Sequence, residues 1–72
     1  IFVQDYPGER GTFTACAERL DHIADLGFTA LEIMPVMAAD KQKGWGYTPR
    51  FFFAVEPRFG NEEQLCHLVD EA

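Results

Sequence analysis

Trp45 and Tyr47, two aromatic residues separated by a single glycine, are the residues of this chain best suited to hold a ligand. They stand in the loop-like sequence Gly-Trp-Gly-Tyr-Thr-Pro (Gly44–Pro49), which follows an apolar stretch that stops at Pro35. Aromatic faces held on a loop can stack against flat apolar surfaces such as sugar rings or bases. From the residues alone, packing of both rings against the protein's own surface is the simpler interpretation, since aromatic side chains usually serve cores.

Glu32 and the run Phe51–Phe53 are two other candidates for function. Glu32 is an acid within an apolar stretch, where a buried charge must be paired. We expect a structural ion pair rather than catalysis, because a catalytic carboxylate needs a second one ~5–9 Å away. Three successive rings cannot all face one groove, so we expect Phe51–Phe53 to be packing residues rather than a sugar platform.

Cys16 and Cys66 are separated by most of the chain, and each lies in a helical pattern. We expect two buried thiols, with a disulfide bond as the alternative. Neither cysteine has metal-ligand spacing with His22 or His67, which we expect to be solvated helix residues. No metal site and no cofactor are therefore predicted.

The 72 residues allow at most one small domain, and seven Phe, two Tyr and one Trp are many for so short a chain. The net charge of −6 argues against binding to nucleic acid or to an anionic membrane surface, because no basic stripe is present. No apolar run approaches the ~20 residues that span a bilayer. No secretory leader is visible, and we expect a cytoplasmic location. The chain begins at Ile1 and stops at Ala72 within an expected helix, so we expect a piece of a larger protein.

Alternating hydrophobic periods predict the elements that position these residues. β-Branched and aromatic residues predict a strand near Ile1–Gln4, and an apolar stripe at helical spacing predicts a helix over Phe13–Leu26. Thr12 is the expected N-cap of that helix, and Gly27 is its expected left-handed end. A near-continuous apolar run predicts a buried strand over Thr29–Met34.

The remainder of the chain adds a loop and a second helix. Polar residues and glycines predict a loop over Met37–Arg50. Asn61 and Gln64 form a capping-box pattern at the start of a helix expected over Glu62–Ala72. A strand, a helix and a strand within about 35 residues predict one βαβ unit with its two strands parallel and adjacent. The repeated order predicts α/β architecture.

The order and spacing of these segments are specific enough to suggest a family. Gly-Phe-Thr-Ala-Leu-Glu-Ile-Met-Pro-Val (Gly27–Val36) resembles the second barrel strand of the α-amylase superfamily of glycoside hydrolases, and Thr12–Gly27 resembles its first barrel helix. Trp45-Gly46-Tyr47, Phe52–Ala54, and Phe59-Gly60 followed by a capped helix are similar to the loop and helix that come next. The Trp-Gly-Tyr form resembles the branch that contains glycogen branching, debranching and trehalose-releasing enzymes.

The resemblance implies a fragment of a TIM (β/α)8 barrel that covers roughly strand 1 to helix 2, with residues 1–72 as part of the catalytic domain. It implies a retaining hydrolase or transglycosylase that acts on α-glucan oligosaccharides or polysaccharides. The family's catalytic carboxylates fall on later strands, so no catalytic residue is expected in this segment. Tyr47 matches the family tyrosine that stacks under the sugar at the cleavage site, and Trp45 is expected to help shape that wall.

A second hypothesis, from a different class, is a non-catalytic barrel fragment that self-associates and at most binds sugar weakly. Two strands of a barrel would leave open edges on both sides, and so short a chain buries little apolar surface. The expected partners of the segment are therefore the remainder of its barrel or further copies of itself. We expect the isolated 72 residues not to hydrolyse α-glucans.

Overall fold

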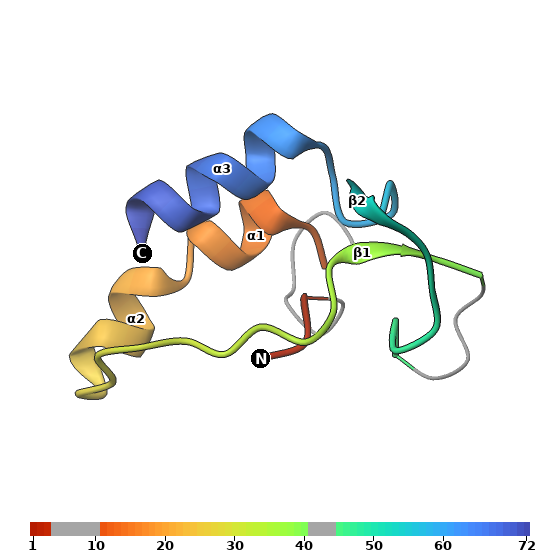
Figure 1. The fold of residues 1–72 in the computed structure, drawn as a ribbon. Coiled ribbons are helices and arrows are strands. Elements are labelled where there is room, and N and C mark those ends of the chain that lie inside the picture. The colour runs from red at the N-terminus through yellow and green to blue at the C-terminus, as the bar shows by residue number, and fades with distance from the viewer. Residues whose placement is uncertain (4–10, 41–44) are drawn as a thin grey trace.

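The computed structural model describes residues 1–3, 11–40 and 45–72, which form three helices and a two-stranded antiparallel sheet. In chain order the elements are α1 (Phe13–Ala17), α2 (Leu20–Asp25), β1 (Met37–Ala39), β2 (Pro49–Val55) and α3 (Glu62–Glu71). α1 lies against α3, α2 extends away from this pair, and residues 28–36 lead back to β1 (Figure 1). Gln4 of the first expected strand and Gly44 of the aromatic loop lie outside the described residues.

A small aromatic core joins α1, α3 and the turn before α3. Phe13 is fully buried, and its backbone N–H donates to the carbonyl of Phe59 at 2.8 Å. The rings of these two residues meet edge to face at 5.9 Å between centroids, and Phe2 meets Phe59 in the same way at 6.3 Å. The buried members of the core are Val3, Phe13, Cys16, Phe59 and Leu68. Because such side chains remove a large apolar area from water, this core fixes α1 relative to α3.

The helix expected over Phe13–Leu26 is present but is divided into α1 and α2. It begins as predicted, because the Thr12 hydroxyl accepts the N–H of Ala15 at 3.2 Å. At the division, the N–H of Arg19 donates to the carbonyl of Cys16, three residues back, which is the tighter 3₁₀ pattern. The prediction of one continuous helix is therefore wrong at this turn.

The other helix ends agree with the prediction. Gly27 follows α2 at a φ of 94°, a left-handed conformation that favours glycine. Asn61 and Gln64 form a reciprocal capping box at the start of α3: each side-chain oxygen accepts the other residue's N–H at 2.9 Å. Leu68 on this helix is buried in the core. Local capping chemistry therefore sets where these helices begin and end.

The two strands predicted at Ile1–Gln4 and Thr29–Met34 are not regular strands in the structure. Residues 28–36 have no assigned secondary structure, and none of their side chains is buried. A strand is defined by its ladder of hydrogen bonds to neighbours, and in the described part of the chain the one sheet consists of β1 and β2. The prediction of regular strands is therefore wrong for the described residues, and so is the predicted burial of Thr29–Met34.

The two predicted strand segments are nevertheless hydrogen-bonded to each other. The amino group of Ile1 donates to the carbonyl of Glu32 at 2.6 Å, and the N–H of Met34 donates to the carbonyl of Ile1 at 2.8 Å. Ile1 thus bonds to both Glu32 and Met34, the two neighbours of Ile33. This is the slanted hydrogen-bond pattern of a parallel strand pair. The segments lie side by side and parallel at this point.

A two-stranded antiparallel sheet occupies part of the loop predicted over Met37–Arg50. The paired positions are Met37 with Val55, Ala38 with Phe51, and Ala39 with Pro49, with register shifts between successive pairs. The aromatic and β-branched residues of β2 favour this extended conformation. The prediction of a loop is therefore wrong at both ends. β1 and β2 lie on either side of the loop that carries Trp45 and Tyr47.

Candidate functional site

The loop between β1 and β2 carries both predicted binding residues, Trp45 and Tyr47. Gly46 between them has a φ of 87° and lies against Pro35. A Cβ at Gly46 would lie 3.2 Å from both the Cβ and the carbonyl oxygen of Pro35, so a glycine suits this close approach best. The contact holds the two aromatic residues next to the C-terminal end of residues 28–36.

Trp45 and Tyr47 are both exposed, over 63% and 62% of their surface. Trp45 has a φ of 54°, in the left-handed region that residues with a Cβ seldom adopt. Neither ring packs into the core of the described residues. Two exposed rings on a backbone anchored at Gly46 can stack against a flat apolar ligand.

An ion pair lies at the base of this loop. Arg50 Nε is 3.0 Å from Asp40 Oδ1, and both side chains are exposed. The guanidinium of Arg50 also lies over the ring of Phe51, 5.8 Å from its centroid. Exposed pairs of this kind contribute at most about 1 kcal/mol. The pair therefore contributes little to the stability of the fold. It connects Asp40, directly after β1, with Arg50 in β2.

Phe51–Phe53 are exposed rather than packed, and Phe53 is exposed completely. The prediction of packing residues is wrong in this structure, because no described layer covers the two-stranded sheet. Phe52 and Phe53 line an open apolar groove of about 300 Å³ between β2 and α3, together with Met37 and Leu65 among others. The aromatic surface of the segment is therefore larger than Trp45 and Tyr47 alone.

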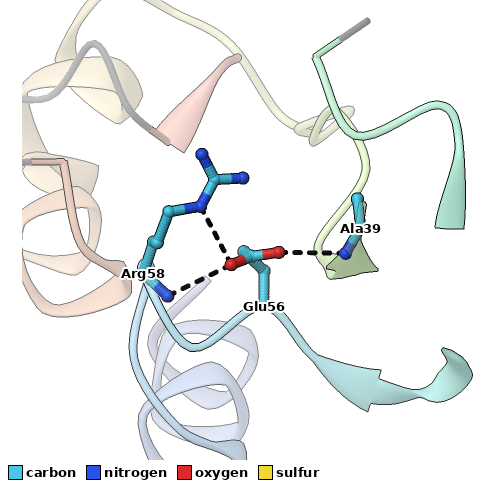
Figure 2. A network of polar contacts seen from close by, with 3 residues as sticks. All are labelled: Ala39, Glu56 and Arg58. Carbon is cyan, nitrogen blue, oxygen red and sulfur yellow. Dashed lines mark hydrogen bonds and ion pairs between the residues drawn. The ribbon is translucent and has the colours of Figure 1, made fainter. Parts of the chain in front are cut away.

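Among the described residues the buried charge is Glu56, whereas Glu32 is exposed. Glu56 is only 6% exposed. Its Oε2 accepts the N–H of Ala39 at 3.0 Å, and its Oε1 accepts from Arg58 Nε at 2.9 Å (Figure 2). Burial alone would raise the pKa of this carboxyl, but hydrogen bonds from the Arg58 side chain and from the backbone outweigh it and hold the pKa below its usual value. The prediction that Glu32 is buried is wrong for the described residues, which leave it exposed, and its pairing with a residue from another part of the barrel stays a prediction.

The two cysteines lie in different environments. Cys16 is a free thiol in the core, and its burial raises the pKa of that thiol. Cys66 is free and exposed, so the prediction of buried thiols is confirmed for Cys16 and wrong for Cys66. His22 and His67 are exposed, as predicted.

Within residues 1–3, 11–40 and 45–72, no three His, Cys, Asp or Glu side chains come together as metal ligands would. No helix in the same part of the chain is long and apolar enough to cross a membrane.

Comparison with known families gives one match that covers nearly the whole chain. The family described as alpha amylase, catalytic domain, matches residues 2–72. The chain therefore belongs to the α-amylase family and carries part of its catalytic domain. This confirms the resemblance deduced from the order of the segments.

Individual relatives agree with the family. The malto-oligosyltrehalose trehalohydrolase of Deinococcus radiodurans is 45% identical over 62 residues, which is 86% of this chain and 10% of that protein. The enzyme of the same name from Mycobacterium tuberculosis (strain CDC 1551 / Oshkosh) is 37% identical over 60 residues, 83% of this chain and 10% of that protein. The 1,4-alpha-glucan branching enzyme GlgB of Nitrobacter winogradskyi is 40% identical over 60 residues, 82% of this chain and 8% of that protein.

The chain spans about a tenth of the length of the curated relatives it matches. No solved structure matches it. The family is thus established by sequence.

Proposed function

We propose that this segment forms the part of a catalytic (β/α)8 barrel from strand 1 to helix 2, in a retaining hydrolase or transglycosylase that acts on α-glucans. The match of the alpha amylase catalytic domain over residues 2–72 carries this proposal. Relatives named for malto-oligosyltrehalose and for 1,4-alpha-glucan support that class of substrate.

The contact between the N-terminal residues and residues 28–36 supports the barrel position. The two hydrogen bonds that Ile1 makes on either side of Ile33 follow the pattern of a parallel pair. The helical residues of α1 and α2 lie between these segments in the chain, as they do in a βαβ unit. In a complete barrel, further strands would supply the ladder that residues 28–36 lack here.

Within this proposal, Tyr47 stacks against the sugar at the reaction centre and Trp45 shapes the wall beside it. Both rings are exposed on a loop that Gly46 anchors at Pro35. Barrel enzymes build their sites from loops at the C-terminal ends of the strands, and this loop follows that end of residues 28–36. A ring that contacts the sugar best in its distorted, reacting form raises the rate.

The reacting carboxylates belong, in this proposal, to residues outside the segment. A retaining mechanism needs a nucleophilic carboxylate and a carboxylic acid about 5–5.5 Å apart. The single buried carboxylate of the described residues, Glu56, is held by Arg58 and the backbone of Ala39. It is therefore a structural group and not half of such a pair.

Substitution of Tyr47 in the full-length protein tests this function. We expect Tyr47→Ala to lower kcat/KM on α-glucans about tenfold or more, because it removes the stacking ring. Tyr47→Phe should keep most of the activity, because it keeps that ring. Phe28→Ala is the matched control, since Phe28 is 64% exposed but lies at the other end of residues 28–36. A value for Tyr47→Ala within about twofold of the wild type would remove Tyr47 from the site.

A second candidate is a non-catalytic, self-associating fragment with at most weak sugar binding. The exposed rings of Phe51–Phe53 favour it, because apolar surface of this kind is normally covered by a partner. The full-length protein separates the candidates: turnover of α-glucans supports the enzyme, whereas self-association without turnover supports the second candidate.

A further inference from the structure

Glu56 takes no part in the proposed contact with sugar, yet its carboxylate binds the last residue of β1, where the aromatic loop begins. We propose that Glu56 is a positioning residue which, through Ala39, fixes the loop that carries Trp45 and Tyr47. The consequence for sugar binding rests on the proposed function, whereas the consequence for the loop rests on the geometry alone.

The ladder is incomplete at the end of β1. Ala39 stands opposite Pro49, which has no N–H to donate to the carbonyl of Ala39, so the N–H of Ala39 is the one donor this pair could use in the ladder. The register is also shifted between Ala38 and Ala39. The N–H of Ala39 donates instead to Oε2 of Glu56 at 3.0 Å. The carboxylate thus takes the place of a ladder partner at the last residue before the loop.

Glu56 holds both ends of β1. Its own N–H donates to the carbonyl of Val36 at 2.8 Å, directly before β1, while its carboxylate accepts from Ala39 at the far end. The loop then returns to Pro35 through the close contact at Gly46. Glu56 therefore links Ala39, directly before the loop, to Val36, and Gly46 within the loop contacts the adjacent residue Pro35.

Arg58 keeps the carboxylate turned toward the loop. Its Nε and its backbone N–H donate to Oε1 of Glu56 at 2.9 and 3.4 Å, which leaves Oε2 for Ala39 (Figure 2). The guanidinium also lies over the ring of Phe59, 5.7 Å from its centroid, and Phe59 is buried in the core. A continuous set of contacts therefore runs from the core to Ala39, the last residue before the loop.

Hydrogen exchange of the full-length protein tests the positioning without reference to activity. Glu56→Ala removes the acceptor of Ala39, so the amides of Ala39 and of residues 45–48 should exchange about tenfold faster. Glu56→Gln keeps a side-chain oxygen for Ala39 and should keep most of the protection. Asn61→Ala is the stability control, because it removes the cap of α3 without changing the hydrogen bonds of Glu56. If Glu56→Ala does not fold, Glu56→Asp shortens the reach and gives the same test.

A double-mutant cycle tests the consequence for sugar. Glu56→Ala should raise KM for α-glucans more than it lowers kcat, and it should add little when Tyr47 is already Ala, because it acts through that ring. Unchanged exchange at Ala39 in both Glu56→Ala and Glu56→Asp would overturn the positioning role. Independent, multiplying effects of Glu56→Ala and Tyr47→Ala would overturn its action through Tyr47. An effect on exchange without any effect of Tyr47→Ala on turnover would overturn the proposed function and leave the positioning of the loop intact.

Discussion

Gly27 and Gly46 share a positive φ, 94° and 87°, but differ in their surroundings. A Cβ at Gly27 would meet nothing within 4 Å, whereas a Cβ at Gly46 would lie 3.2 Å from Pro35. The backbone conformation alone makes alanine about 1 kcal/mol less favourable than glycine at either position. The two glycines therefore separate the cost of a left-handed backbone from the cost of a steric contact.

We expect Gly46→Ala in the full-length protein to weaken binding of an α-glucan oligosaccharide about tenfold, because the loop must move off Pro35. Gly27→Ala should lower the free energy of unfolding by roughly 1 kcal/mol and leave binding unchanged. Isothermal titration calorimetry of both variants measures the difference. Equal affinities for the two variants would contradict the anchoring role of Gly46.

The two acids Glu32 and Glu56 show what sequence could and could not predict at this scale. Glu32 stands in the longer apolar run, so it was the expected buried charge, but the described residues do not cover it. Glu56 binds Ala39, which lies seventeen residues earlier in the chain. No local sequence pattern contains this contact, so the burial of Glu56 was not predictable from its neighbours. Arg58, two residues after Glu56, was the one local signal of a paired carboxylate.

At the scale of elements, helix ends were predictable because their hydrogen bonds are local. Thr12 and the pair Asn61 and Gln64 cap their helices through bonds that span three residues. Strands were not predictable in the same way, because each depends on a partner distant in sequence. The alanines of β1 have a low propensity for strands, so the sequence does not predict this strand. The apolar residues of 28–36 predict a strand, but these residues form no regular ladder in the structure.

Removal of the capping box should weaken α3. We expect Asn61→Ala to lower the free energy of unfolding by about 1 kcal/mol, because the N–H of Gln64 loses its acceptor. His67→Ala is the control, since His67 is exposed in the same helix and alanine suits a helix at least as well. Denaturant unfolding of the full-length protein compares the two. A loss for His67→Ala as large as that for Asn61→Ala would show that the cap is not the cause.

At the scale of the whole molecule, the core is small relative to the aromatic surface. In the described part of the chain, five apolar residues form the buried core, whereas Trp45, Tyr47 and Phe51–Phe53 are all exposed. So short a chain rarely gains more than ~3–5 kcal/mol from one core. Exposed rings and unpaired edges of this kind favour association with other protein surface.

We therefore expect the purified 72 residues, on their own, to associate or to remain unfolded, and not to release reducing sugar from α-glucans. Analytical ultracentrifugation together with thermal unfolding measures the first expectation, and a reducing-sugar assay measures the second. A monomer that unfolds cooperatively would contradict the first, and sugar release would contradict the second.

The structure of the full-length protein with an α-glucan oligosaccharide bound tests the proposed function most directly. We predict that the ring of Tyr47 lies against a glucose ring at van der Waals separation, about 4 Å. Residues 28–36 should then form a strand parallel to the N-terminal residues of this segment, with the ladder continued around Ile33. An oligosaccharide bound in the catalytic site with no atom in contact with Tyr47 would contradict the role given to this loop.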